Sequence, residues 1–538
     1  MREEVLTLLA FTDLHGRVLE WDYLDDAPPT EPGSLARIST LVNRIRVEST
    51  ASLLFDVGDT IQGTAMMTLA AREQTRPHPM SVALNHLGVD VACVGNHELN
   101  FGLDHLRAYA DACFFPVLAA NLHGAQGIAE RALIEVAVGS LGTVTVGVIG
   151  LTTPGSAIWD RPHLEGKASV GGIAESAAEQ VNALRAAGAD LVIALSHSGL
   201  GPSSTYGDGL PWPENDTRLL IRQTPGIDAV FLGHEHVEKI GHEQCLASGI
   251  EVPYVEPLCF GRRLGRIDLT LSRTAEGRIE VIGSTPQSLP VADAAPDPSM
   301  SGLLTDAHER TRAYGAKRIG VAAEAIAAWP VTLGPSPALD LVNAIQSAAV
   351  SHALTPLNQP RLRVLSATAL FGAHDGLPAG PLSIRNLNRL YPFENLLQAV
   401  ELSTTQLLAY LEHNALGFGI SDVPSYNVDS LGSAEHDVSY LIDADAAPGS
   451  RVSELRIDGA APDPDERFVL ALSSYRASGG GAFPATAGNP LVYDAQAEVR
   501  DLLIGWIRER GTVRLDDIRR TSWRVRQRTP DWVGRSDV

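Results

Sequence analysis

Six short apolar runs punctuate the first 290 residues, and each ends in glycine or polar residues: VLTLLAF, ASLLFDV, DVACVG, VTVGVIG, DLVIALS and DAVFLG. Helical patterns separate them, such as GGIAESAAEQVNALRAAGA, which we expect to form a crossover helix. This alternation predicts an α/β fold whose strands feed loops at their carboxyl ends, where such folds bind ligands. Near residues 269–284, the runs LTLS and IEVIGS predict a closing hairpin.

A turn-rich segment, DAAPDPSM, begins a linker that we place at residues 293–330. A helical pattern follows, with Pro298 suited to its first turn and Gly315 to its end. The predicted domains are therefore residues 1–292 and residues 331–538, joined by a linker that includes one helix.

The charge balance excludes one class of partner. The 538 residues include 42 basic and 64 acidic ones, which gives a formal net charge of −22. Such a chain repels polyphosphate backbones, so we expect no nucleic-acid polymer as a partner. An anionic substrate must be small or must meet a local positive site, which metal ions can supply.

The sequence leaves the compartment open. The four cysteines are scattered without a Cys-x-x-Cys spacing, which predicts neither a zinc ribbon nor a disulfide framework. The N-terminus, MREEVLTLLAFTDLHG, does not read as a signal peptide, and no run of about 20 apolar residues predicts a membrane span. We expect either a cytoplasmic protein or the mature form of an exported one.

Residue types that bind metals follow five of the predicted strands. They are Asp13 and His15 in TDLHG, Asp59 in FDVGDTIQG, Asn96 in GNHE, His197 in LSHSG, and His234 and His236 in GHEH. Taken singly, each has a structural reading, because an aspartate can cap a helix or make a turn and a histidine can simply be hydrogen-bonded. Their shared position at strand ends predicts one common site.

These seven side chains offer nitrogen and oxygen ligands without sulfur, and they are more than one tetrahedral ion needs. A carboxylate has two oxygens and can bridge two cations, so we predict a dinuclear site. Imidazole together with carboxylate suits Zn, Mn, Co or Fe better than Mg or Ca alone. The expected cofactors are two divalent metal ions whose identity stays open.

The ordered series Asp-x-His, Gly-Asp, Gly-Asn-His-Glu, Ser-His-Ser-Gly and Gly-His-x-His resembles the calcineurin-like metallophosphoesterases. The second half resembles the C-terminal domain of the 5'-nucleotidase superfamily. The resemblance implies a two-sheet α/β sandwich domain followed by a C-terminal α/β nucleotidase domain. It also implies the metal ligands: Asp13, His15 and His236 for one ion, Asn96, His197 and His234 for the other, and Asp59 as the bridge.

Within GNHELNFG, the resemblance assigns His97 to the phosphate, as a hydrogen-bond donor or as the proton donor to the leaving oxygen. The 5'-nucleotidases usually carry an aspartate three residues later, where this chain has Asn100. That difference, the stretch TDLHGRVLEWDYLDD and the lack of arginine in FGAHDG favour the 2',3'-cyclic-nucleotide 2'-phosphodiesterase/3'-nucleotidase branch. The implied reactions convert 2',3'-cyclic nucleotides to 3'-nucleotides and then to nucleoside and phosphate.

Two other functions stay open. One is a 5'-nucleotidase or nucleotide-sugar hydrolase built on the same domains. The other is a non-catalytic nucleotide-binding or surface-interaction protein, for which we would expect a metal ligand to be lost, whereas all seven are present.

Two stretches of the second domain could hold a nucleobase. In VPSYNVDS and LSSYRASGGGAFP the candidate substrate-binding residues are Tyr426, Asn427, Tyr475, Gly479 and Gly480. An aromatic ring beside a glycine-rich loop lets a flat base approach and stack, although each tyrosine could equally be a half-buried packing residue. By resemblance, two aromatic side chains from these loops clamp the base.

Replacement of Tyr426 or Tyr475 by alanine is expected to raise KM for nucleotides, because a stacked base contributes about 1–3 kcal/mol. Hydrolysis of a small aryl phosphodiester, which has no base, should be largely spared. Steady-state kinetics with both substrates checks this, and equal damage to both would mean that the tyrosines serve folding instead.

Overall fold

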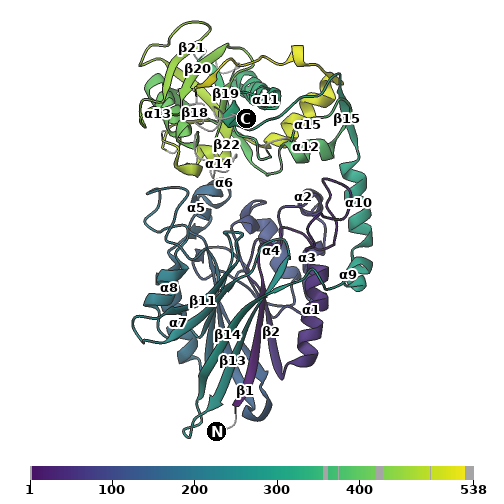
Figure 1. Ribbon diagram of the computed structural model, residues 1–538, viewed down its shortest axis with the longest axis vertical. Coiled ribbons are helices and arrows are strands. Elements are labelled where there is room, and N and C mark those ends of the chain that lie inside the picture. Colours follow the sequence, from purple (N-terminus) through teal and green to yellow (C-terminus); the bar gives the residue numbers. More distant parts are fainter. Residues whose placement is uncertain are drawn as a thin grey trace, which may run out of the picture. The chain divides into compact units, whose positions relative to one another are not determined.

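The computed structural model describes residues 3–354, 362–372, 375–418, 428–484, 486 and 488–526. Tyr426 and Asn427 therefore lie outside the described residues. The chain divides into two compact units between Ala313 and Tyr314 (Figure 1).

The first unit is built on two six-stranded sheets (Figure 1). In spatial order, the first sheet holds β14 (Ile279–Pro290), β13 (Arg263–Arg273), β1 (Glu3–Phe11), β2 (Ala51–Asp56), β3 (Val91–Cys93) and β4 (Val117–Leu118). The second holds β11 (Lys239–Gln244), β12 (Glu251–Glu256), β10 (Ala229–Leu232), β9 (Leu191–His197), β7 (Thr143–Thr152) and β6 (Arg131–Ala137).

Apolar side chains on both faces of these strands join four layers. In β1, Leu6 and Leu8 belong to the core between the two sheets, whereas Leu9 and Phe11 point into a second core under helices. The helices over the first sheet are α1 (Leu35–Glu48), α3 (Pro79–Leu87) and α4 (Leu103–Ala112), and those over the second are α7 (Ile173–Ala186) and α8 (Thr217–Gln223). This burial explains the continuous apolar runs, and the predicted two-sheet sandwich and crossover helix are confirmed.

Parallel pairing brings the carboxyl ends of the central strands to one edge. Strand β1 runs parallel to β2, which runs parallel to β3, and in the other sheet β9 runs parallel to both β7 and β10. The antiparallel pair β13–β14 confirms the predicted closing hairpin. The loops that follow β1, β2, β3, β9 and β10 consequently meet at the same end of the sandwich.

Shorter elements complete the first unit: α2 (Ala65–Arg72), β5 (Leu122–His123), α5 (Ser156–Trp159), α6 (Arg161–Leu164), β8 (Ser169–Val170) and α9 (Pro298–Leu303). Helix α10 (Thr305–Gly315) continues across the boundary between the units. The linker pattern predicted one helix, but the structure has two, α9 and α10, which meet at Leu304. The hydroxyl of Thr305 donates to the carbonyl oxygens of Ser301 and Gly302 at this break. Such bonds compete with the helical ladder, as expected for a β-branched hydroxyl residue near a glycine.

The second unit is also α/β. Its five-stranded sheet has the order β19 (Ser430–Gly432), β16 (Arg363–Thr368), β22 (Arg467–Ser473), β18 (Leu396–Ser403) and β23 (Leu491–Glu498). Two three-stranded sheets are β17 (Gly380–Ser383), β15 (Arg318–Ala322) and β24 (Thr512–Val513), and β21 (Val452–Ile457), β20 (Val438–Asp443) and β25 (Arg524–Arg526). The helices are α11 (Pro337–Leu354), α12 (Ile384–Leu390), α13 (Thr404–Asn414), α14 (Ser474–Ala477) and α15 (Val499–Arg510).

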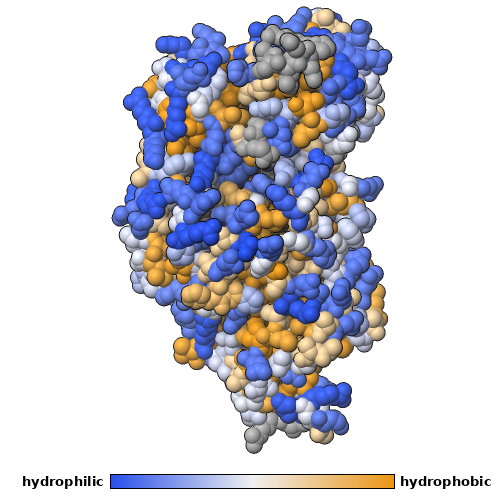
Figure 2. Space-filling view, turned by 180° about the vertical axis from the view of Figure 1, so that it is seen from behind, coloured by the Kyte–Doolittle hydropathy of each residue, from blue (hydrophilic) through white to orange (hydrophobic). Residues whose placement is uncertain are grey.

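The surface is mixed in character. Figure 2 shows hydrophilic side chains interspersed with apolar ones on the face in view. Within the described ranges, the structure contains no helix that is both long and apolar enough to cross a membrane.

Candidate metal centre

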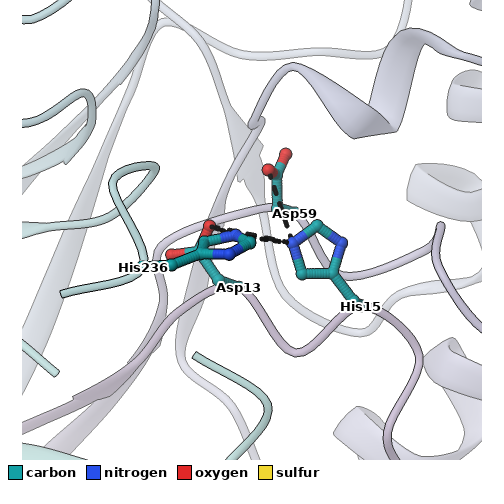
Figure 3. A group of neighbouring side chains, drawn as sticks. All are labelled: Asp13, His15, Asp59 and His236. Carbon is teal, nitrogen blue, oxygen red and sulfur yellow. Dashed lines mark hydrogen bonds and ion pairs between the residues drawn. The ribbon is translucent and has the colours of Figure 1, made fainter. Parts of the chain in front are cut away.

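The loops after the parallel strands bring the predicted ligands together. Asp13, His15, Asp59 and His236 form one group of potential metal ligands, whose side chains point toward one another in Figure 3. The Nε2 atom of His236 lies 3.2 Å from Asp13 Oδ1, and the Nε2 atoms of His15 and His236 lie 2.9 Å apart. In each group the ligand atoms lie within 4.8 Å of one another, which is close enough to share a cation.

A second group contains Asp59 again, now with His197 and His234. His197 Nε2 lies 3.1 Å from Asp59 Oδ2 but makes no hydrogen bond to any residue that the structure describes. The amide oxygen of Asn96 is buried and equally lacks a hydrogen-bond partner in the described part of the chain. Buried polar atoms without partners are costly in folded proteins, and a coordinated cation would satisfy both.

Five of the predicted ligands share an unusual backbone conformation. Asp13, His15, Asp59, His234 and His236 have φ angles of 50°, 47°, 56°, 84° and 57°, respectively. Residues other than glycine rarely adopt positive φ, and each such residue costs of order 1–3 kcal/mol. Strain of this kind is concentrated at functional sites, where the surrounding structure holds it in place.

Glycines allow the loops to approach closely. Gly58 has a φ of 100°, which turns the chain sharply after β2 so that Asp59 faces the site. A Cβ on Gly95 would lie 2.3 Å from Asp59 Oδ1 and 2.9 Å from the His197 ring. The glycines in the Gly-Asp and Gly-Asn-His-Glu motifs are therefore required by the spacing of the ligands.

Glu98 fastens the Asp59 loop to the Asn96 loop. Its buried carboxylate accepts hydrogen bonds from the backbone N–H groups of Asp59, Thr60, Ile61 and Gly95, at 2.6–3.1 Å. Glu98 had no predicted role, although it stands within the GNHE motif. Its place there was the one available signal.

The electrostatics suit a cation. Burial would raise the pKa of Asp59, but the positive charge of a protonated His197 reverses this and holds the pKa well below its usual range. Burial opposes protonation of His197, yet the charge of Asp59 outweighs it and raises the His197 pKa to about 10. The buried carboxylates thus demand a positive partner, which a divalent cation provides more strongly than a histidine does.

Side chains outside the two groups contact the predicted ligands and hold them in position. Glu214 lies 2.9 Å from His234 Nε2, which leaves Nδ1 of that ring for the site, and Trp159 stacks on the His234 ring with centroids 5.6 Å apart. The hydroxyl of Thr12 donates to Asp13 Oδ2 at 2.7 Å. A histidine held by a carboxylate through its second ring nitrogen is a recurrent feature of metal sites. No sequence spacing marked Glu214 or Trp159.

His97 stands beside this centre without joining either group of ligands. Its backbone N–H donates to Asp59 Oδ1 at 2.8 Å, and its Nε2 lies 4.0 Å from Asp59 Oδ2. Its Nδ1 lies 2.6 Å from the amide oxygen of Asn100, and the amide nitrogen of Asn100 donates to Asp160 Oδ1 at 2.8 Å. Burial raises the pKa of Asp160 to about 7, against the opposing effects of Asn100 and His97.

In the second unit, the described base-binding candidates lie in α14 and directly after it. Tyr475 is half-buried, and a Cβ on Gly480 would lie 2.6 Å from its ring, so the two residues are packed together. The buried Arg476 donates to both carboxylate oxygens of Asp429 at 2.9 and 3.0 Å and to the Gly480 carbonyl at 2.7 Å. Arg476 therefore ties α14 and the glycines that follow it, Gly479 and Gly480, to Asp429, a contact that the sequence did not predict.

Each of the two units matches a known protein family. Residues 6–238 match the family described as calcineurin-like phosphoesterase, and residues 318–488 match the 5'-nucleotidase C-terminal domain. The chain is 30% identical, over 93% of its length and 85% of the relative's, to the 2',3'-cyclic-nucleotide 2'-phosphodiesterase/3'-nucleotidase of Salmonella typhimurium. It is also 30% identical to the trifunctional nucleotide phosphoesterase protein YfkN of Bacillus subtilis, covering 94% of this chain but only 38% of that protein.

A solved Staphylococcus aureus structure in complex with alpha-ketoglutarate shares the fold. Its TM-score is 0.79 at 22% identity, with 97% of this chain and 99% of that chain covered. The comparisons and the clustered Asp and His side chains identify a divalent-metal phosphoesterase, a hydrolase of phosphoric esters. The chain belongs to the 5'-nucleotidase superfamily of calcineurin-like metallophosphoesterases, in which it groups with the 2',3'-cyclic-nucleotide 2'-phosphodiesterase/3'-nucleotidase branch.

Proposed function

We propose that this phosphoesterase hydrolyses 2',3'-cyclic nucleotides to 3'-nucleotides and then releases phosphate from the 3'-nucleotides. The observation that carries the proposal is the carboxylate of Asp59, which belongs to both groups of potential metal ligands. A carboxylate shared in this way favours a pair of cations, the arrangement that clamps a phosphoryl group during in-line displacement.

The proposed centre holds two divalent ions, for which Zn, Mn, Co or Fe suit the nitrogen and oxygen ligands. When bound, such a pair lowers the pKa of a water nucleophile and neutralises charge on the phosphoryl oxygens. The ligands assigned to the two ions are Asp13, His15 and His236, then Asn96, His197 and His234, with Asp59 shared.

The proposed role of His97 is to give a proton from Nε2 to the leaving oxygen. Its side chain is 22% exposed, so a substrate can reach it, and its backbone bond to Asp59 fixes it beside the shared ligand. Asn100 takes the place of the aspartate usual in 5'-nucleotidases. A strained five-membered cyclic phosphate asks less of a general acid than an unstrained ester, which fits this replacement.

The substrate class rests on the relatives and on the second unit. The two relatives named above carry names of nucleotide phosphoesterases, and this chain matches the C-terminal domain of 5'-nucleotidases. Tyr475 with Gly479 and Gly480 offers a stacking surface for a base, and Tyr426 with Asn427 is proposed as its counterpart. That same domain match supports the second candidate, a 5'-nucleotidase.

Loss of the shared carboxylate tests the metal assignment. Asp59→Ala is expected to lose at least one of two bound ions and nearly all activity, because both groups of ligands include Asp59. Metal content measured by mass spectrometry, with activity, checks this. Asp458→Ala is the matched control, since Asp458 is also an aspartate with positive φ, at 54°, but lies in the second unit. Two retained metals with near-normal turnover in Asp59→Ala would contradict the bridge.

The role of His97 is separable from metal binding. His97→Ala should keep both metals but lower kcat by about 10²–10⁴-fold, the usual contribution of a positioned acid. His86→Ala, on the exposed side of α3, should change neither quantity. A loss of metal in His97→Ala would make His97 a ligand and exclude the proposed role.

Substrate preference separates the two candidate enzymes. With saturating Mn²⁺, Co²⁺ or Zn²⁺, kcat/KM should fall in the order 2',3'-cyclic AMP, 3'-AMP, 5'-AMP. The segment FGAHDG has no arginine to hold a doubly charged terminal phosphate, whereas a cyclic diester carries one charge. A larger kcat/KM for 5'-AMP than for 2',3'-cyclic AMP would favour the 5'-nucleotidase instead.

A further inference from the structure

We propose that Asp160 is a positioning residue of the phosphoesterase: its carboxylate orients the amide of Asn100, and that amide in turn orients the imidazole of His97. The inference deepens the proposed function and rests on the role given there to His97. The relay consists of two hydrogen bonds, His97 to Asn100 at 2.6 Å and Asn100 to Asp160 at 2.8 Å.

The first step of the relay concerns the two ends of the Asn100 amide. An amide has an oxygen that accepts and a nitrogen that donates, whereas an ionised carboxylate can only accept. Asp160 therefore draws the amide nitrogen toward itself and turns the amide oxygen toward His97. The oxygen can only accept, so Nδ1 of His97 must carry a hydrogen.

The second step concerns the other ring nitrogen. With hydrogen fixed on Nδ1, Nε2 is the nitrogen left to face the metal centre, where it lies 4.0 Å from Asp59 Oδ2. As the bond between phosphorus and the leaving oxygen breaks, that oxygen takes the Nε2 proton. The water that attacks phosphorus gives up a proton in turn, which restores the imidazolium, so the ring ends each cycle unchanged.

The third step concerns charge. An imidazolium next to a neutral amide alone is stabilised only by the amide dipole. When ionised, Asp160 adds a negative charge behind that dipole and polarises the amide oxygen, as linked hydrogen bonds do in a site of low dielectric. The relay thus supplies, one residue further away, the carboxylate that a direct His-Asp pair would supply.

The surroundings of Asp160 support a dedicated role. Asp160 is 2% exposed. Its backbone N–H donates to the Ser156 carbonyl of α5, and its carbonyl oxygen accepts from the backbone N–H groups of His163 and Leu164 in α6. Its Oδ2 atom has no hydrogen-bond partner within the described residues, and its Oδ1 atom accepts the hydrogen bond from Asn100. A buried carboxylate without a salt bridge there costs stability, which argues against a purely structural role.

The same short segment also touches the metal centre. Trp159, the residue before Asp160, stacks on the ring of His234 at 5.6 Å. The adjacent residues Trp159 and Asp160 therefore contact a predicted ligand and the acid relay, respectively. Asp160 lies between α5 and α6, which have four residues each, so its position depends on both short helices.

A carboxylate swap tests the relay. We expect Asp160→Asn to lower kcat for 2',3'-cyclic AMP by about 10–100-fold, part of the effect of a general acid, with little change in KM or metal content. The double variant Asn100→Asp with Asp160→Asn moves the carboxylate next to His97 and keeps both hydrogen bonds. It should recover most of the lost kcat.

The leaving group provides a readout that a structural role would not move. Bis(p-nitrophenyl) phosphate expels p-nitrophenolate, which needs no proton, so Asp160→Asn should lower kcat for this substrate less than fivefold. Assays at pH 8 keep Asp160 ionised, since this is above its pKa of about 7. Asp190→Asn is the control, because the Asp190 carboxylate accepts a backbone hydrogen bond from Thr145 in the second sheet and should not change this selectivity.

Two further outcomes separate the proposals. If Asp160→Asn does not fold, Asn100→Ala should show the same loss that depends on the leaving group. Equal losses of kcat on both substrates in Asp160→Asn, with no recovery in the double variant, would overturn the relay. The absence of a leaving-group-dependent loss of kcat in Asn100→Ala would overturn it as well. If His97→Ala itself lost activity equally on both substrates, the general-acid role of His97, and not only the relay, would be wrong.

Discussion

The carboxylate of Asp59 is the constraint around which the first unit is organised. It belongs to both groups of potential ligands, so the ends of four strands, β1, β2, β9 and β10, must place side chains around one pair of oxygens. Close approach of those loops requires the glycines at 58 and 95, and the buried Glu98 fastens two of the loops together through backbone N–H groups. The sandwich provides the rigid frame, since its parallel strands all present their carboxyl ends at the same edge.

This arrangement opposes stability, and bound metal would offset part of the cost. Five of the predicted ligand residues adopt positive φ, and the carboxylates of Asp13 and Asp59 are almost fully buried side by side. Cations that bind the folded chain and not the unfolded one shift the equilibrium toward the fold. Strain and buried charge are concentrated at this candidate centre, where bound cations would couple metal binding to folding.

The alternating apolar runs predicted the α/β strands, the hairpin and the ligand residues at strand ends, and the family resemblance implied the two-sheet sandwich. Apolar strands end in polar motifs: Asp13 and Asp59 follow β1 and β2 closely, and His197 is the last residue of β9. Asp160, Glu214 and Arg476 were missed because each contacts a residue that is distant in the sequence, respectively Asn100, His234 and Asp429. The linker was predicted as one helix, because periodicity does not register a break made by a single hydroxyl side chain, that of Thr305.

Anomalous diffraction from crystals grown with Mn²⁺ or Zn²⁺ tests the central claim most directly, because it locates each ion without assuming a mechanism. Two peaks about 3.5–4 Å apart are expected, both within about 2.2 Å of Asp59 oxygens. One should also contact Asp13, His15 and His236, and the other Asn96, His197 and His234. A single peak, or two peaks of which one does not touch Asp59, would contradict the shared-carboxylate centre.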